Sequence, residues 1–314
     1  MSRVLVTGAT GFVGARVVDA LLDKQHEVHA VARKTGAERP GLTWHAADLL
    51  APAAAESVVE ESQARCLMHL AWYAVPGRFW TAPENERWID ASLRLVRAFG
   101  EAGGRRAVMA GTCAEYRWGG AVLSERETAL EPATLYGACK RATYLAAESV
   151  AADLGMSLAW GRIFFLYGPG EPLGRLVSGV ITGLLSGASV PTTDGHQRRD
   201  FMHVDDVANA FAALVDADIS GAINIATGEA VRVRDVVELI ERAVGVHERV
   251  RYGALPTRAG EPEVIVADAR RMHDELGFRP MIALGPGLVD AVAWWRDASP
   301  TAPSSGDTDS DSNL

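Results

Sequence analysis

The sequence contains little cysteine and carries an excess of acidic residues. Only Cys66, Cys113 and Cys139 are present, with no Cys-x-x-Cys pair, so we expect a reduced, intracellular chain rather than a disulfide scaffold. The simplest interpretation of Cys113 and Cys139, which lie near the motifs described below, is that they are small buried side chains. A net charge of −9 argues against binding to nucleic acid or to an anionic membrane.

No segment is apolar for long enough to span a bilayer. The first strand is expected almost at the first residue, with no signal peptide before it. We therefore expect a cytoplasmic protein without a membrane partner. The segment 299–314 is rich in Ser, Asp and Pro and has no aromatic residue, which predicts a flexible tail.

Short apolar segments alternate with helically spaced ones through the first half of the chain. Strands are expected at 3–8, 27–33, 42–48, 66–72, 105–111 and 157–168, and helices at 11–24, 86–103 and 134–155. This alternation predicts βαβ units with right-handed crossovers. The expected fold class is therefore α/β, a doubly wound parallel sheet covered by helices on both faces.

The second half of the chain is less regular and indicates an interleaved second lobe. A further buried strand is expected at 222–226, and it could return to the first sheet. We predict a first domain over 1–164 to which 201–228 returns. A smaller second domain is expected over 165–200 and 229–298.

A glycine-rich turn separates the first strand from its helix. Gly8, Gly11 and Gly14 form the pattern G-x-x-G-x-x-G. Glycine permits a tight turn, lets the backbone approach a pyrophosphate and lets the helix sit close to the strand. The free N–H groups of the helix N-terminus then face the phosphates, so the pattern predicts a dinucleotide site.

The residues after the second strand bear on the choice of cofactor. NAD sites usually place a carboxylate here to bond the ribose 2′-hydroxyl, whereas NADP sites hold the 2′-phosphate with arginine. This sequence has Arg33 and Lys34 and no carboxylate. We therefore expect NADP(H), with NAD the less favoured cofactor; the alternative is that both side chains are solvated surface cations. Asp48 is a candidate for bonding the adenine.

Tyr136 and Lys140 stand four residues apart on an expected helix, so they share one face. An ammonium beside a phenol favours the phenolate, which can exchange a proton with a carbonyl or alcohol oxygen. Surface pairing is the alternative for such a short motif. Thr112, at the end of an expected strand, could hydrogen-bond the same substrate oxygen.

With these elements in order, the chain resembles the extended short-chain dehydrogenase/reductase family, in its nucleotide-sugar epimerase, dehydratase and reductase branch. The resemblance covers roughly residues 3 to 296 and includes the motifs TGATGFVG, HLAW, GTCAEY, YGACK, RIFFLYGPGE, QRRDFMHVDDVA, INIATGE and RAGEPE. It implies a Rossmann domain, a smaller substrate domain and a sugar nucleotide between them. It also implies that Thr112, Tyr136 and Lys140 form a catalytic triad.

The resemblance assigns further residues. Phe12, Val13, Leu49, Leu70 and Ala71 join the cofactor site, and Trp72 joins the substrate site. Arg199 and Arg258 match positions that hold the nucleotide diphosphate, as arginine forks suit phosphate oxygens; surface ion pairs are the alternative. We assign no metal site. A homodimer is expected, with 86–100 and 136–153 as candidate interface helices.

The sequence also departs from the family. Cys113 and Ala114 follow Thr112, where 4,6-dehydratases carry an Asp-Glu pair, so water elimination is disfavoured. Phe165 replaces a common asparagine. The stretch with Trp72, Tyr73, Phe79, Trp80 and Trp88 is unusually aromatic. These rings either pack in the core or form an apolar wall for a deoxygenated sugar.

Epimerases of this family retain their cofactor, usually NAD, whereas net reductases usually exchange NADPH. Arg33 and Lys34 therefore favour an NADPH-dependent 4-ketoreductase of a nucleotide-linked 4-keto-6-deoxyhexose, in deoxysugar biosynthesis. The alternative is an NAD(P)-dependent nucleotide-sugar 4-epimerase. An alternative of another class is a catalytically silent NADP-binding sensor or scaffold.

Overall fold

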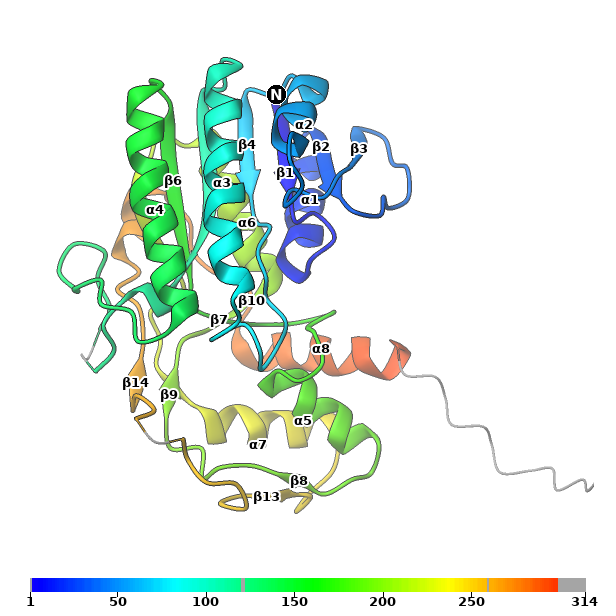
Figure 1. Cartoon of the computed structure of the whole chain (residues 1–314). Coiled ribbons are helices and arrows are strands. Elements are labelled where there is room, and N and C mark those ends of the chain that lie inside the picture. Colours follow the sequence, from blue (N-terminus) through cyan, green and yellow to red (C-terminus); the bar gives the residue numbers. More distant parts are fainter. Residues whose placement is uncertain (1, 120–121, 259, 299–314) are drawn as a thin grey trace, which may run out of the picture.

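A computed structural model of the protein describes residues 2–119, 122–258 and 260–298 (Figure 1). The tail predicted over 299–314 lies outside the described residues. A large sheet with helices on both faces fills the upper part of Figure 1, and a smaller lobe lies below it.

The central sheet has seven parallel strands in the order β11-β6-β5-β4-β1-β2-β3. Their bounds are β1 Arg3–Thr7, β2 Glu27–Ala32, β3 Leu42–Ala46, β4 Cys66–His69, β5 Arg106–Thr112, β6 Ser157–Ile163 and β11 Gly221–Ile225. The strand order reverses between β1 and β4, which is where doubly wound sheets bind ligands. The predicted α/β fold is confirmed.

Helices cover both faces, which explains why the strands are nearly continuous apolar runs. One face carries α1 (Phe12–Asp23) and α6 (Val204–Asp216), which share a buried core with the sheet. The other face carries α2 (Ala54–Ser62), α3 (Glu84–Glu101) and α4 (Leu135–Asp153). Figure 1 shows α3 and α4 side by side, and they contact each other.

The single strand predicted over 157–168 is wrong, because the chain leaves the large sheet at Phe164. Phe164 N donates to Ile225 O at 3.4 Å, whereas Phe165 N donates to Asp200 O at 3.1 Å. The partner strand β11 ends at Ile225, so the ladder has nothing further to pair with. The next residues form β7 (Phe165–Tyr167), which pairs with β10 (Phe201–His203) in a separate small sheet.

The lower lobe has its own apolar core. Its helices α5 (Leu176–Leu185), α7 (Val233–Val244) and α8 (Leu284–Ala298) pack around side chains such as Ile181, Ile240 and Leu288. The short strands are β8 Val190–Pro191, β9 Arg198–Arg199, β12 Val231–Arg232, β13 Val250–Arg251 and β14 Val264–Ile265. Two short helical turns, η1 (Cys113–Glu115) and η2 (Arg271–Glu275), complete the described elements. The domain boundaries stay a prediction.

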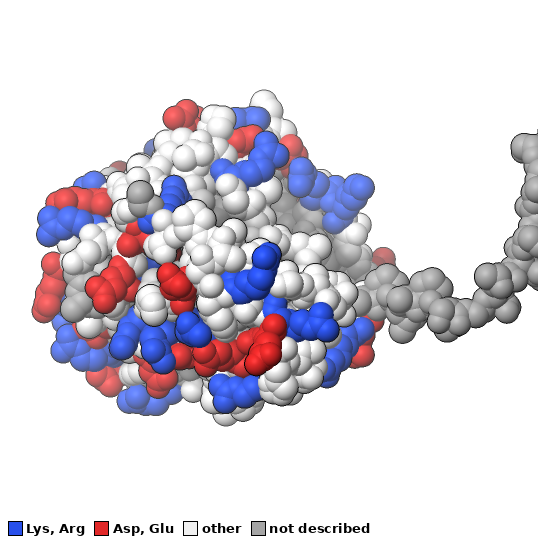
Figure 2. All heavy atoms as spheres, turned by 90° about the horizontal axis from the view of Figure 1, so that it is seen from below, with Lys and Arg blue, Asp and Glu red and all other residues white. Residues whose placement is uncertain are grey.

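Basic and acidic side chains are interspersed on the face seen from below (Figure 2). Within the lower lobe, Arg232 pairs with Asp235 and Arg234 pairs with Glu238. Charges on this lobe are therefore partly neutralised by close neighbours. Across the described part of the chain, no helix combines the length and apolarity that a membrane crossing requires.

Candidate active site

The glycine turn is packed too tightly for any side chain. Gly8 has φ +71°, and a Cβ added there would lie 2.7 Å from Ala71 N. A Cβ on Gly14 would lie 1.9 Å from Gly8 O, closer than any real contact. Gly11 N donates to Gly8 O at 2.9 Å, which closes the turn. The turn therefore requires glycine, and it brings the start of α1 against the segment after β4.

The N-terminus of α1 is open to an anion. Gly11 is the N-cap, no side chain caps the helix, and its first turn contains no acidic residue. Phe12, Val13 and Gly14 therefore carry backbone N–H groups without partners inside the helix. With Leu70 and Ala71 next to Gly8, the turn fits a dinucleotide pyrophosphate at the point where the strand order reverses.

The residues predicted to select the cofactor lie where β2 and β3 end. Ala47 N donates to Ala32 O at 3.0 Å, so the residues that follow these two strands are neighbours. Arg33 and Lys34 are exposed, and neither has a hydrogen bond or ion pair with any described residue. Asp48 is also exposed and accepts from Leu50 N at 3.0 Å, while Leu49 is buried.

Helix α4 presents the tyrosine and the lysine one turn apart. Thr134 caps the helix by accepting from Gly137 N at 3.1 Å. Lys140 is buried, and its Nζ donates to Ala110 O at 2.9 Å. Burial lowers the pKa of Lys140 to about 7, and the negative charge of Glu115 opposes this shift. The lysine charge is therefore sensitive to pH near neutrality.

Tyr136 is half-buried and is flanked by two aromatic rings. Its ring lies edge-on to Phe79, with centroids 4.9 Å apart, and edge-on to Trp80, with centroids 5.9 Å apart. Burial raises the pKa of Tyr136 strongly, and the neighbouring Thr112 hydroxyl and the positive charge of Arg175 offset it in part. A phenolate at this position therefore needs positive charge close to it.

The structure brings Thr112 to this tyrosine and shows a supporting residue, Glu115, that the sequence analysis missed. Thr112 and Glu115 form a capping box: the Thr112 hydroxyl accepts from Ala114 N at 3.2 Å, and Glu115 Oε1 accepts from Thr112 N at 2.8 Å. The spacing Thr-x-x-Glu after a strand was the signal that could have predicted this turn.

Glu115 is fully buried and also joins β5 to β6. Its carboxylate accepts from Trp160 Nε1 at 2.9 Å and from Arg162 Nε at 2.8 Å. Arg162 Nη1 donates to the Tyr116 hydroxyl at 3.0 Å, and that hydroxyl donates to Asn224 Oδ1 at 2.7 Å. This buried network links the turn that carries Thr112 to β11 at the edge of the sheet.

A second buried chain of polar groups lies behind the glycine turn. His69 Nδ1 is 2.7 Å from the Thr7 hydroxyl, and its Nε2 is 2.8 Å from the Ser92 hydroxyl. Burial, together with the positive charge of Lys140, lowers the pKa of His69 to about 3. His69 is therefore a neutral structural residue that ties β1 and β4 to α3.

The two predicted phosphate-binding arginines differ in their surroundings. Arg199, on β9, is buried, and its Nη2 forms an ion pair with Glu261 Oε1 at 2.7 Å. Arg258 is exposed, and its carbonyl accepts from Glu261 N at 3.1 Å. Both arginines therefore contact Glu261, which the sequence analysis missed. The Glu261 carboxylate pairs with one Nη atom of the Arg199 guanidinium.

Aromatic residues from two segments form a wall beside Tyr136. Phe79 and Trp80 have centroids 4.3 Å apart, and Trp80 and Trp118 have centroids 6.2 Å apart. All three are only partly buried. Phe165 stands at the place of the family asparagine. Its ring centroid lies 5.9 Å from that of Phe201 and 5.5 Å from Cζ of the Arg199 guanidinium.

Both cysteines near the site are buried, as predicted. Burial raises the pKa of Cys113 to about 12, so it is a thiol and not a nucleophile. Across the described residues, no cluster of His, Cys, Asp and Glu could hold a metal ion.

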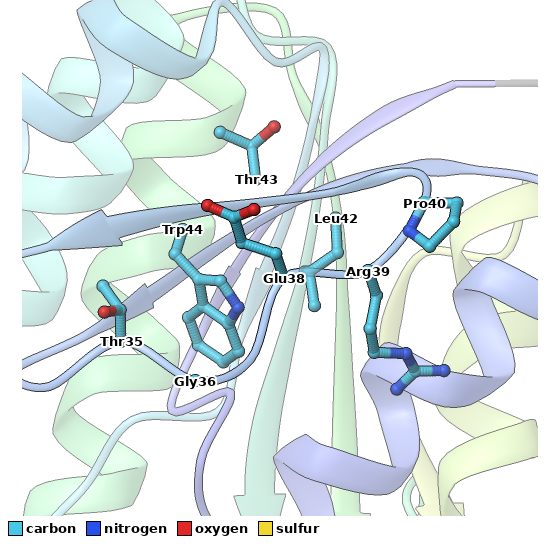
Figure 3. Close-up of a pocket in the computed structure, with 8 residues that line it drawn as sticks. All are labelled: Thr35, Gly36, Glu38, Arg39, Pro40, Leu42, Thr43 and Trp44. Carbon is cyan, nitrogen blue, oxygen red and sulfur yellow. The ribbon is translucent and has the colours of Figure 1, made fainter.

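A pocket of about 690 Å³ lies at the connection from β2 to β3 (Figure 3). Its lining residues are Thr35, Gly36, Glu38, Arg39, Pro40, Leu42, Thr43 and Trp44. This pocket is separate from Tyr136, because β3 is one edge of the sheet and α4, which carries Tyr136, contacts β5 and β6 toward the other edge. It adjoins the segment of Arg33 and Lys34 but contains none of the predicted site residues.

Comparison with known proteins supports the resemblance found in the sequence. The profile of the NAD dependent epimerase/dehydratase family matches residues 4–226. The UDP-glucose 4-epimerase of Corynebacterium glutamicum is 27% identical over 301 residues, which span 88% of this chain and 91% of that enzyme. The probable UDP-glucuronate 4-epimerase of Rhizobium meliloti is 24% identical over 341 residues, spanning 93% of this chain and 96% of that protein.

Solved structures agree with these matches. MoeE5 in complex with UDP-glucuronic acid and NAD is 32% identical, with a TM-score of 0.84 over 94% of this chain and 99% of MoeE5. A UDP-N-acetylglucosamine 4-epimerase from Methanobrevibacter ruminantium M1 is 25% identical, with a TM-score of 0.85 over 95% of this chain and 99% of that chain. The matched family profile runs from β1 to β11 and covers the glycine turn and the tyrosine–lysine pair. The protein therefore belongs to the NAD dependent epimerase/dehydratase family, within the extended short-chain dehydrogenase/reductase enzymes.

Proposed function

We propose that this protein is a nucleotide-sugar 4-epimerase that uses a nicotinamide dinucleotide. The observation that carries the proposal is the placement of Tyr136 and Lys140 on one face of α4, with Thr112 beside the tyrosine. Similarity to proteins named as sugar-nucleotide 4-epimerases supports it. This reverses the order of the two enzyme hypotheses drawn from the sequence, in which the 4-ketoreductase came first.

In this proposal, the residues of the chain move one proton. The bound nicotinamide ring supplies hydride acceptance and donation at the sugar C4. Tyr136 takes the proton from the sugar O4 hydroxyl and later returns it, while the Thr112 hydroxyl hydrogen-bonds the same oxygen. Lys140 contributes the positive charge that the buried phenolate needs.

A second candidate is an NADPH-dependent 4-ketoreductase of a nucleotide-linked 4-keto-6-deoxyhexose. Two observations favour it: Arg33 and Lys34 are exposed and pair with no residue that the structure describes, at a place where a carboxylate would select NAD, and Phe79 and Trp80 flank Tyr136. A guanidinium suits a 2′-phosphate, and an aromatic face suits the methyl group of a deoxysugar. A silent sensor or scaffold has the least support, because all three catalytic side chains are present.

Turnover with and without added cofactor distinguishes these functions. An epimerase should interconvert UDP-glucose and UDP-galactose, or the corresponding uronates, without net consumption of dinucleotide. A ketoreductase should oxidise one NADPH for each 4-keto-6-deoxyhexose nucleotide that it reduces. Binding of the cofactor without turnover of the UDP-sugars or of the 4-keto-6-deoxyhexose nucleotides would contradict both enzyme assignments.

Cofactor preference is a separate measurement. If Arg33 holds a 2′-phosphate, losing that contact should cost about 1.5–3 kcal/mol, roughly a tenfold to hundredfold preference for NADPH over NADH. Titration of both cofactors against the wild type and Arg33→Ala measures it. Equal affinities in the wild type would contradict the NADP assignment and favour NAD, which is bound in several similar structures.

We also propose a cytoplasmic homodimer, with α3 and α4 as the candidate interface. Leu145 on α4 is a large apolar side chain with 47% exposure, which fits a contact surface. Sedimentation of the wild type and Leu145→Glu tests the assembly. A monomeric wild type would contradict it.

A further inference from the structure

Trp72 covers the ammonium group of Lys140. Lys140 Nζ lies 3.9 Å from the centroid of the Trp72 ring, well within the range of a cation–π contact. The same Nζ donates to Ala110 O, which uses one of its three N–H groups. The indole ring therefore covers one side of a buried ammonium group that also donates a hydrogen bond to a backbone carbonyl.

The indole is held in place by two neighbours on α3. Its Nε1 donates to Asn85 Oδ1 at 2.7 Å, and the Trp88 ring stacks on it with centroids 6.2 Å apart. Asn85 is fully buried, and its Nδ2 donates to Phe79 O at 2.7 Å and to Ala82 O at 2.8 Å. One asparagine thus joins the ring over Lys140 to the segment that carries Phe79 beside Tyr136.

The other groups around Lys140 give it limited stabilisation. His69, at the end of β4, is neutral because burial and the charge of Lys140 lower its pKa to about 3. Glu115 is negative, but it is paired with Arg162 at 2.8 Å. Tyr136 is protonated in the resting protein, since burial raises its pKa, and the Trp160 ring lies farther away, at 5.9 Å. Among the described residues, the Trp72 face is, after the Ala110 carbonyl, the nearest group that attracts the cation without being shared with another charge.

We propose that Trp72 is a positioning residue that keeps Lys140 charged and fixed beneath Tyr136, and that Asn85 acts through Trp72 by anchoring its indole. The consequence for turnover rests on the proposed function. The effect on Lys140 itself does not, because the charge of the lysine can be measured directly.

The composition of the chain makes this measurement simple. The sequence contains only three lysines, Lys24, Lys34 and Lys140, and the first two are exposed. In full-length protein with isotope-labelled lysine, NMR should show three titrating side chains, and the Lys140 signal is the one lost in Lys140→Met. A matched pair of variants then distinguishes the effect of the aromatic face from the effect of side-chain volume. Trp72→Phe retains an aromatic face, whereas Trp72→Leu retains only apolar volume.

Losing the aromatic face should lower the Lys140 titration midpoint by about half a unit to one and a half units in Trp72→Leu. Trp72→Phe should show a smaller shift. Trp294→Leu, a partly exposed tryptophan on α8, is the control and should leave the midpoint unchanged. An unchanged or raised midpoint in Trp72→Leu would overturn the proposal, because packing or water access would then control the lysine.

The role of Asn85 is tested by combining variants. Asn85→Ala should lower the Lys140 midpoint in the wild type but add no further shift in Trp72→Leu, since there is no indole left to anchor. An equal shift in both backgrounds would show that Asn85 does not act through Trp72. If Asn85→Ala does not fold, Trp72→Phe also removes the N–H that Asn85 accepts, and its midpoint should lie between those of the wild type and Trp72→Leu. Failure of all sugar nucleotides to turn over would contradict the proposed function and leave these midpoints unaffected.

Discussion

Glu115 Oε2 accepts a hydrogen bond from Arg162 Nε at 2.8 Å, and both side chains are at most 1% exposed. The same carboxylate holds the backbone N–H of Thr112. A buried ion pair therefore supports the turn that positions Thr112 in the candidate active site.

Removing the carboxylate should destabilise the fold strongly. Glu115→Ala leaves the Arg162 guanidinium buried without its partner, which typically costs about 3–5 kcal/mol. Urea denaturation measures the loss. Glu131→Ala is the control, because Glu131 and Arg117 form an exposed pair at 3.3 Å that should matter little. Similar losses in both variants would show that burial is not the cause.

Gly14→Ala should disturb the glycine turn that is proposed to bind the cofactor. The new Cβ would lie 1.9 Å from Gly8 O, so α1 must move away from the turn. We expect a loss of about 1–3 kcal/mol in the free energy of unfolding, as for overpacked sites, and much weaker NAD binding. Gly179→Ala in α5 is the matched control: nothing lies within 4 Å of its added Cβ. It should stabilise by about 0.5–1 kcal/mol. A tight NAD complex in Gly14→Ala would contradict this account of the turn.

Lys140 should make stability depend on pH. Burial lowers its pKa from an ordinary value of 10.5 to about 7, so the unfolded chain binds one proton more between these limits. The free-energy cost of burying the charged ammonium is fully present below about pH 7. Above about pH 7 the free energy of unfolding rises with pH, by up to about 1.4 kcal/mol per pH unit from this group. Subtracting the profile of Lys140→Met isolates the contribution. A difference that stays flat up to about pH 9.5 would mean that Lys140 titrates like an exposed lysine.

Tyr136→Phe tests the proton transfer in the proposed reaction. The substitution removes one hydroxyl and little volume, so folding and both binding steps should survive. The chemical step should slow by about 10²–10⁴-fold, the usual range for a positioned acid or base. Thr112→Val should be milder, because it leaves the phenol in place. Single-turnover kinetics with UDP-glucose or a 4-keto sugar nucleotide measures both, and near-normal rates in Tyr136→Phe would remove the main support for either enzyme hypothesis.

Substitutions of Arg199 and Arg258 should differ in their effects on stability and on substrate binding. Arg199→Ala removes the partner of Glu261, so it should cost about 1–3 kcal/mol in the free energy of unfolding. Arg258 is exposed, and Arg258→Ala should leave stability nearly unchanged while weakening UDP-glucose binding if it holds the diphosphate. Calorimetry with UDP-glucose and with NAD distinguishes the two ligands. A loss confined to NAD would mean that the wrong phosphate was assigned to Arg258.

Local patterns in the sequence were sufficient for the architecture and for much of the candidate site. Alternating apolar periods predicted the parallel sheet, because each period reflects which face of its own element is buried. The pairing of Tyr136 with Lys140 follows from helix geometry alone, since positions four apart share a face. The glycine spacing predicted the tight turn before α1. In each case the residues concerned are close in the chain.

Contacts between distant segments were decided only by the tertiary structure. The indole of Trp72 reaches Lys140, and Glu261 reaches Arg199, from parts of the chain more than sixty residues away. The end of β6 at Ile163 depends on where its partner β11 ends. No local sequence pattern predicts such long-range contacts, because they depend on the strand order, on the packing of helices against the sheet and on which side chains share one buried volume.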